Sequence, residues 1–289
     1  MAERGRDLPT GSVRVNGSTP TIDAAPRTPG GLRIDVNAWI GSYPYRRIAG
    51  GSPEFLLDEM RRNAIDRAWV SHLAAVFWRD PTEGNAELYR VAERHSQLAP
   101  VPAVHPGLAN WEAVLTEARE RGAPAVRVDP LFYGISPADP AVVAVLRRAG
   151  QLGLPVMLAV RLEDGRQRHP NDGAGDLTPA HLRGLIRSDS SVRLIVTQAD
   201  RDCVEQVVFG ATPEEADRML WDVTAIWGPP MDDLQHLLAT VGADRFCFGT
   251  GLPLRLAEST IAKLDLLTVS AADRAAIEGG NARRFSGSA

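Results

Sequence analysis

The sequence predicts a single α/β domain, a closed (β/α)8 TIM barrel. From Leu32 onward, eight short strand-like segments alternate with segments of helical period. No strand leads into a GxGxxG or P-loop motif, which argues against an open doubly wound nucleotide-binding sheet. The 289 residues also fit one such barrel, which typically takes about 250. In this fold the loops after the strands hold the chemistry.

The predicted strands are short apolar runs bounded by turn residues, as expected for strands buried on both faces. They cover residues 32–36, 67–72, 101–104, 125–128, 156–160, 192–197, 219–223 and 245–249. The predicted helices cover residues 53–63, 84–96, 111–122, 140–152, 179–188, 201–209 and 231–241. Pairs such as Ser52-Pro53 and Asp139-Pro140 are typical of helix starts, and glycines such as Gly122 are typical of helix ends.

The composition divides the chain into two parts and excludes some classes of partner. Residues 1–31 are rich in Gly, Pro, Ser, Thr and Arg without apolar periodicity, which predicts a disordered tail before a barrel domain at 32–289. A net charge of −4 without a basic run argues against nucleic acid and anionic membrane surfaces. The absence of a long apolar stretch and the two cysteines without CxxC spacing favour a cytoplasmic protein. A homodimer is compatible with such a barrel on general grounds.

Motifs at both ends of the barrel resemble the second amidohydrolase family, the hydrolases and decarboxylases typified by aminocarboxymuconate-semialdehyde decarboxylase. Ile34-Asp35 opens the first strand, GADRFCFGTGLP covers residues 242–253, and GNARRF covers residues 280–285. The family pattern at the last strand is similar to "adRilFGSDyP", followed by a terminal "gNAarlf". The resemblance runs from about Leu32 to the C-terminus and implies the barrel fold with a metal-assisted reaction.

The positions at which the family holds its metal carry no ligands in this chain. Asn37 and Trp39 replace the first-strand His-x-His pair, Ala159 and Gln198 replace the histidines of the fifth and sixth strands, and Gly251 replaces the last aspartate. We therefore predict neither a metal site nor another cofactor. An alternative is a rebuilt metal site in which Asp129 joins one or more histidines from the set His72, His105 and His169.

The strongest candidate site is the segment after the fifth predicted strand, RLEDGRQRHP at residues 161–170. His169 or Asp164 is the candidate general base, because a carboxylate that orients an imidazole raises its basicity. Arg161 is the third candidate catalytic residue, since its guanidinium can stabilise developing negative charge. Arg161 and Arg166 also suit the capture of a carboxylate or phosphate by paired hydrogen bonds. An exposed charged loop without function is the alternative.

Five further residues are candidate substrate contacts. Arg127 closes the fourth predicted strand two residues before Asp129, where a charged side chain points into the barrel mouth or pairs with a neighbour. The side-chain amides of Asn37 and Gln198 either form hydrogen bonds with a polar substrate or only fill space. Tyr43 and Trp78 lie in loops where aromatic residues stand beside arginines, which suits a planar anion or simple packing.

These observations leave two functional hypotheses. The first is a metal-independent hydrolase or lyase that acts on a small anionic substrate, with lactone or amide hydrolysis or decarboxylation as its reaction. The second is a non-catalytic barrel, a pseudoenzyme that binds a ligand or protein, whose mouth is plugged by Trp39 and Trp78. Schiff-base and pyridoxal chemistry are excluded, because Lys263 is the one lysine of the chain and we expect it to be a solvated charge.

Overall fold

Eight parallel strands form the centre of the computed structural model, which describes residues 31–287. Most strand residues are buried, as expected where helices cover one face and the barrel interior covers the other. The strands are β1 (Ile34–Ile40), β2 (Arg67–His72), β3 (Leu98–Pro100), β4 (Val126–Arg127), β5 (Val156–Ala159), β6 (Leu194–Thr197), β7 (Met219–Asp222) and β8 (Phe246–Cys247).

Backbone hydrogen bonds close the strands into a barrel, so the predicted fold is confirmed. Within the described residues, the strands form a sheet β1-β2-β3 and a sheet β4-β5-β6-β7-β8. An isolated bridge between Ala103 and Arg127 joins the sheets on one side. On the other side, the backbone N–H of Val36 donates to the carbonyl of Phe248 at 3.0 Å. The third predicted strand, 101–104, follows the observed β3. Val101 and Val104 still donate backbone hydrogen bonds to Val70 and Arg127 at 2.8 Å each, but Pro102 has no N–H with which to continue a regular ladder.

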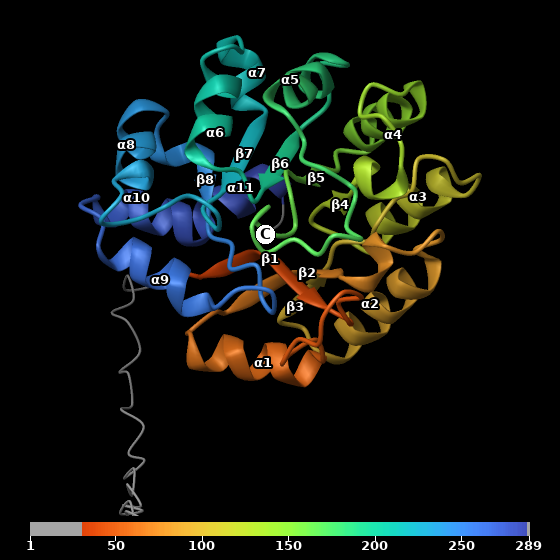
Figure 1. Ribbon diagram of the computed structural model, residues 1–289, viewed down its shortest axis with the longest axis horizontal. Coiled ribbons are helices and arrows are strands. Elements are labelled where there is room, and N and C mark those ends of the chain that lie inside the picture. Colours follow the sequence, from red (N-terminus) through yellow and green to blue (C-terminus); the bar gives the residue numbers. More distant parts are fainter. Residues whose placement is uncertain (1–30, 288–289) are drawn as a thin grey trace, which may run out of the picture.

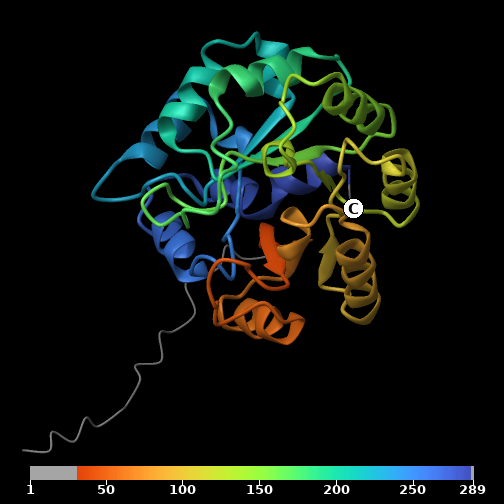
Figure 2. The ribbon, with the colours of Figure 1, turned by 45° about the vertical axis from the view of Figure 1, so that its right-hand side comes forward.

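Helices form the outer ring around the strands (Figure 1, Figure 2). Several begin where prolines and capping side chains predict, since the side chains of Ser52, Asp139 and Thr178 each accept a backbone N–H of the first turn. The helices of the ring are α1 (Pro53–Arg62), α2 (Thr82–Arg94), α3 (Trp111–Glu120), α4 (Pro140–Gln151), α5 (Pro179–Arg187), α6 (Arg201–Val208), α7 (Pro213–Asp217), α8 (Asp233–Thr240) and α9 (Ala257–Asp265).

The C-terminal helices close the N-terminal end of the barrel. After α10 (Ala271–Ala275), α11 (Asn281–Ser286) lies behind the barrel centre in Figure 1. Asn281 donates from Nδ2 to the carbonyls of Ala243 and Phe246, at 2.8 Å each. Ala282 is fully buried among the interior apolar residues. This packing explains the GNARRF motif, whose asparagine and alanine hold the helix against the barrel.

Two further observations concern the start of the chain and the possibility of a membrane-spanning helix. The tail predicted over residues 1–31 lies outside the described residues, apart from Gly31. Across residues 31–287, none of the helices combines the length and the apolar character that crossing a membrane requires.

Candidate functional site

The C-terminal ends of the strands are covered by an apolar cluster. Its buried members are Trp39, Tyr43, Leu73, Val76, Ala159 and Leu162, and Tyr45, Ile48, Phe77, Phe132 and Leu254 pack against them. Trp39 is only 2% exposed and packs with these loop residues over the strand ends. Trp78 does not belong to this cluster: it is 41% exposed and its ring lies tilted against His72.

Beside this cluster, four buried polar side chains meet around the end of β7. We call Asn37, Gln198, Asp222 and Thr224 the polar cluster. Asp222 Oδ2 accepts hydrogen bonds from Asn37 Nδ2 at 2.8 Å and from Thr224 Oγ1 at 2.5 Å. Its Oδ1 accepts the backbone N–H of Gln198 at 2.9 Å. Because parallel strands end at one edge of the barrel, β1, β6 and β7 bring these residues together.

The polar cluster contains unsatisfied atoms and an unusual backbone. Asn37 Oδ1 and Gln198 Oε1 are buried and have no hydrogen-bond partner among the described residues. Gln198 has φ of 61°, a left-handed conformation that non-glycine residues seldom adopt. Burial raises the pKa of Asp222, although the three donated hydrogen bonds oppose the shift. Uncompensated buried polar atoms and local strain are typical of functional sites.

Arg127 occupies the interior of the barrel close to the mouth and is 1% exposed. Its guanidinium lies 4.0 Å from the ring centroid of Trp39, and its Nε donates to Ser71 Oγ at 2.8 Å. Its Nη1 lies 3.6 Å from Asp129 Oδ2. The Arg127 side chain therefore both points into the barrel and pairs with a neighbouring carboxylate, the two alternatives that the sequence left open. Burial lowers the pKa of Arg127, and the charges of Asp129 and Asp222 oppose that shift.

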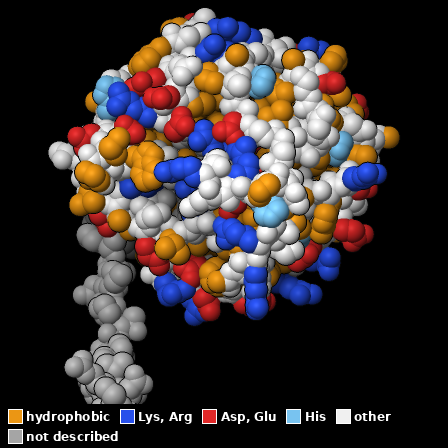
Figure 3. Space-filling view, viewed as in Figure 1, with side chains coloured by type: hydrophobic (Ala, Val, Ile, Leu, Met, Phe, Trp, Pro, Cys, Tyr) orange, Lys and Arg blue, Asp and Glu red, His pale blue; other side chains and the backbone are white. Residues whose placement is uncertain are grey.

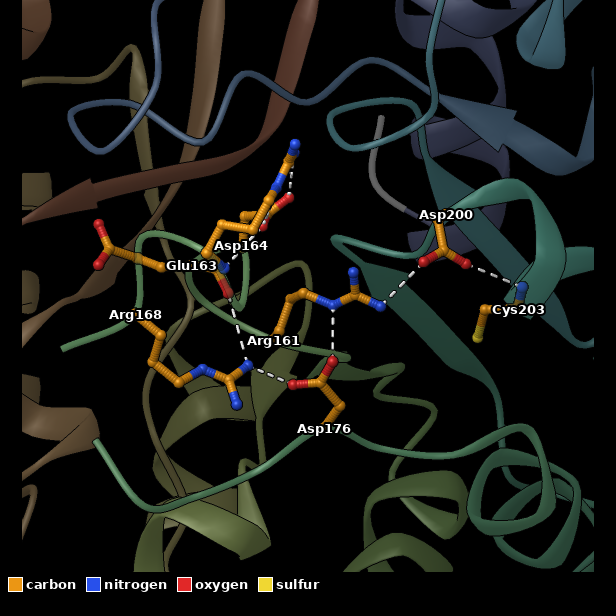
Figure 4. Close-up of polar contacts among 8 residues, drawn as sticks. Arg161, Glu163, Asp164, Arg168, Asp176, Asp200 and Cys203 are labelled. Atoms are coloured by element: carbon orange, nitrogen blue, oxygen red, sulfur yellow. Dashed lines mark hydrogen bonds and ion pairs between the residues drawn. The ribbon is translucent and has the colours of Figure 1, made fainter. Parts of the chain in front are cut away.

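The loop after β5 crosses the middle of the barrel and is fastened by ion pairs (Figure 1, Figure 4). Arg161 lies between two carboxylates, with Nε 3.0 Å from Asp176 and Nη2 2.9 Å from Asp200. Arg168 pairs with the other oxygen of Asp176. Asp200 also accepts the backbone N–H of Cys203 and so caps α6. Arg161 therefore connects this loop to the start of α6.

A second set of contacts connects the β5 loop to the loop after β1. Glu163 is buried, and its carboxylate accepts Tyr43 Oη at 2.9 Å and Arg46 Nη2 at 2.5 Å. The ring of His169 stacks on Tyr45 with 5.1 Å between centroids and 7° between planes. Figure 3 shows basic side chains near the middle of this face with acidic ones beside them. The loop is thus held on two sides.

The structure places Asp164 and His169 on one loop without a contact between them. Asp164 instead forms two hydrogen bonds to the exposed guanidinium of Arg166, at 2.9 and 3.0 Å. These bonds hold the pKa of Asp164 well below its usual range. Nδ1 of His169 accepts the backbone N–H of Asn171 at 3.1 Å. The carboxylate that was expected to orient the imidazole is therefore engaged elsewhere.

The residues at the family's metal positions do not fit a divalent cation. Asn37 directs its amide N–H toward Asp222, whereas a divalent cation requires oxygen ligands directed at it. Three hydrogen bonds to the Asp222 carboxylate also use oxygen lone pairs that a cation would need. Within residues 31–287, no group of three His, Cys, Asp or Glu side chains could hold a metal. The histidines of the rebuilt site are separate, since His72 contacts Glu87 whereas His105 packs on Tyr133.

Sequence reasoning missed three residues of the mouth and misplaced one lysine. Asp222 and Thr224 end a predicted strand just as Arg127 and Asp129 do, so the same signal could have found them. Arg255 follows β8 in a segment without a motif. The expectation of a solvated Lys263 is wrong. Its Nζ donates to the carbonyls of Val223, Thr224 and Ile226 at 2.7 to 3.0 Å, and burial lowers its pKa to about 8.

Comparisons with known proteins identify the fold. No family model and no curated protein matches the chain. Among solved structures, 2,6-dihydroxybenzoate decarboxylase from Rhizobium is similar with a TM-score of 0.69 and 13% identity, over 89% of this chain and 99% of that one. The 5-carboxyvanillate decarboxylase of Novosphingobium aromaticivorans, solved with bound manganese, gives 0.68 and 15% over 89% and 97%. A probable 2-pyrone-4,6-dicarboxylic acid hydrolase from Acinetobacter baumannii gives 0.64 and 13% over 88% and 99%. The chain has the fold of these proteins, so the resemblance is confirmed at the level of the fold.

Proposed function

We propose that the protein is an enzyme that acts on a small anionic molecule at the C-terminal end of the barrel, by hydrolysis or by lysis of a carbon bond. The observation that supports this most is the polar cluster, where the oxygens of Asn37 and Gln198 are buried without partners beside Asp222. Such oxygens are suited to accept hydrogen bonds from a bound molecule. The similar solved structures include decarboxylases and a probable hydrolase, which agrees with this reaction class.

We assign the role of general base to His169, and we propose that the reaction uses protein side chains without a metal ion or other cofactor. Imidazole is the side chain best suited to exchange protons near neutral pH. In hydrolysis, His169 would accept a proton from the attacking water and return it to the leaving group. Asp164 is less suited to this role because Arg166 holds its carboxylate in the charged form. Metal independence is part of the proposal, and the misfit of the polar cluster to a cation supports it.

Replacement of His169 tests this assignment. Purified protein treated with a chelator is incubated with hydroxybenzoates, pyrone dicarboxylates and lactones, and loss of substrate is followed by absorbance and mass spectrometry. We expect His169→Ala to lower turnover about 100-fold or more, the usual effect of removing a general base. His105→Ala is the matched control, because its Nδ1 also accepts a backbone N–H two residues on, and it should keep the activity. Equal losses in both variants would contradict the assignment.

A non-catalytic barrel is the second candidate, and the apolar cluster favours it. Trp39, Tyr43 and Leu162 are buried across the mouth, which leaves a substrate little access while the β5 loop is in place. This candidate predicts that no compound of the set is turned over. Turnover that depends on His169 would exclude it.

A further inference from the structure

Arg255 near the mouth is partly buried and has no partner among the described residues. Arg161 pairs with Asp176 and Asp200, Arg166 pairs with Asp164, and Arg127 is held inside the barrel. Arg255 is partly buried, yet among residues 31–287 its side chain makes no hydrogen bond and no ion pair. A partly buried guanidinium normally has such partners, whereas the nitrogens of Arg255 are left to solvent. The free guanidinium therefore requires an explanation.

The side chains of Arg255 and of Gln198 in the polar cluster both lie against Gly251, which follows β8. A Cβ atom at Gly251 would lie 3.0 Å from Gln198 Nε2 and 3.2 Å from Arg255 Cδ. Gly251 also has φ of 73°, which disfavours any side chain there. Gln198 is 2% exposed, and its Oε1 has no partner in the described part of the chain. The stem of Arg255 and the buried amide of Gln198 thus lie on either side of the same glycine after β8.

Three carboxylates lie near Arg255, and none of them forms a hydrogen bond or an ion pair with it in the described part of the chain. The carboxylates of Asp222, Glu163 and Asp164 are close enough to interact with it through space, but each is already bound by other donors. The guanidinium of Arg161 is also near and adds positive charge. A planar oxyanion would supply the missing acceptors for Arg255, and a carboxylate matches the guanidinium geometry.

We propose that Arg255 and Gln198 form a binding site for the carboxylate group of a small organic acid. The proposal rests on the function proposed above, because it names the residues that hold the anionic group of that substrate. Arg255 donates two parallel hydrogen bonds to the carboxylate, and Nε2 of Gln198 donates to the same group. Oε1 of Gln198 is then left to accept a hydrogen bond from a hydroxyl group of the acid. The site has no counterpart among the residues that sequence reasoning selected for anion capture, Arg161, Arg166 and Arg127.

Titration calorimetry of the full-length protein with sodium benzoate tests the site, with sodium sulfate as an inorganic probe. We expect wild-type protein to bind benzoate, Arg255→Met to weaken binding at least tenfold, and Arg255→Lys to lie between them. Gln198→Leu should weaken binding severalfold. The matched control is Arg147→Met, which removes a half-exposed guanidinium from α4, outside the residues proposed for binding, and should bind as wild type does. Sulfate that competes with benzoate would identify the site as one for oxyanions in general.

Thermal unfolding of the variants separates binding from a structural role. Without ligand, Arg255→Met should unfold at the same or a higher temperature than wild type, since it removes an unpaired and partly buried charge. A lower unfolding temperature together with unchanged benzoate affinity would overturn the proposal, as would the absence of benzoate binding to wild type. Calorimetry measures binding without turnover. If wild-type protein is inactive and Arg255→Met still loses benzoate affinity, the proposed enzymatic function is contradicted while the proposed carboxylate site is supported.

Discussion

Asp35 joins the first strand to the last. It lies on β1, is fully buried, and accepts the backbone N–H groups of Asn37 at 2.9 Å and Thr250 at 3.0 Å on one oxygen. Its other oxygen accepts the hydroxyl of Thr250. Burial raises the pKa of Asp35 to about 6, because these hydrogen bonds offset only part of the desolvation. The Ile34-Asp35 motif therefore contributes a barrel contact rather than a metal ligand.

The raised pKa of Asp35 predicts a pH-dependent stability. Between pH 4 and 6 the folded protein keeps a proton that the unfolded chain releases, so this residue's contribution to stability falls as pH rises through that window. Asp35→Asn removes the titration and can keep both backbone hydrogen bonds. Its unfolding free energy should improve relative to wild type by on the order of 3 kcal/mol from pH 4 to 7, and the difference should stay constant above pH 7. Urea denaturation at each pH measures this; a difference that does not vary with pH would contradict it.

For individual residues, the sequence predicted where a side chain lies in the barrel better than which side chain it bonds to. Asn37, Gln198 and Arg127 lie at the mouth because strand ends can be located from apolar runs. That Asn37 bonds Asp222, 185 positions away, depends on barrel closure and has no local signal. Arg255 was missed for a related reason: its lack of a partner is a property of the folded surroundings.

Among the elements, the β5 loop differs most from its expected role. Its charged residues were predicted to form the site, and several of them also bind the loop to neighbouring loops. Arg161 reaches Asp200 at the start of α6, and Glu163 reaches Tyr43 and Arg46 after β1. Sequence patterns located α1, α4 and α5 to within a residue or two because prolines and caps act locally. Ion pairs between loops join residues that are far apart in the sequence, so the contacts that hold the β5 loop could not be predicted.

Breaking the Arg161 ion pairs should loosen the loop and expose Cys203. Cys203 is 5% exposed, and burial raises the pKa of its thiol to about 12. In Arg161→Met we expect an aromatic disulfide reagent to label Cys203 about tenfold faster, since local opening becomes easier by about 1.4 kcal/mol. The positive charge of Arg161 lowers the pKa of Cys203. Loss of that charge alone would leave less reactive thiolate and slow the labelling, so faster labelling would indicate opening of the loop.

Two internal comparisons make the labelling experiment specific. Arg166→Met changes the same loop but removes only an exposed pair with Asp164, and its labelling rate should equal that of wild type. Cys247 is fully buried in β8 and should react only on global unfolding. If Cys203 and Cys247 react together in Arg161→Met, the protein unfolds as a whole and the loop is not a separate unit.

Across the whole molecule, the barrel encloses fixed charges that belong to its own side chains. Arg127 lies under Trp39 and faces Asp129, with Asp222 near enough to influence it. A buried guanidinium requires anionic and aromatic neighbours to offset its desolvation, and this barrel provides both. The fold was predictable because alternating strands and helices extend over the whole chain. The internal charge balance was not, because it depends on which strand ends become neighbours.

This arrangement predicts that divalent cations do not stabilise the protein. A metal that binds the folded state at 100 times its dissociation constant would add about 2.7 kcal/mol, which raises the unfolding temperature of a chain of this size by several degrees. Because Asn37, Thr224 and the Gln198 backbone already donate to Asp222, and Arg127 supplies the positive charge, we expect the unfolding temperature in a chelator and in excess manganese to agree within about 1 °C. A saturable increase with one manganese ion per chain would show that the mouth rearranges to bind a metal, and metal independence would then be wrong.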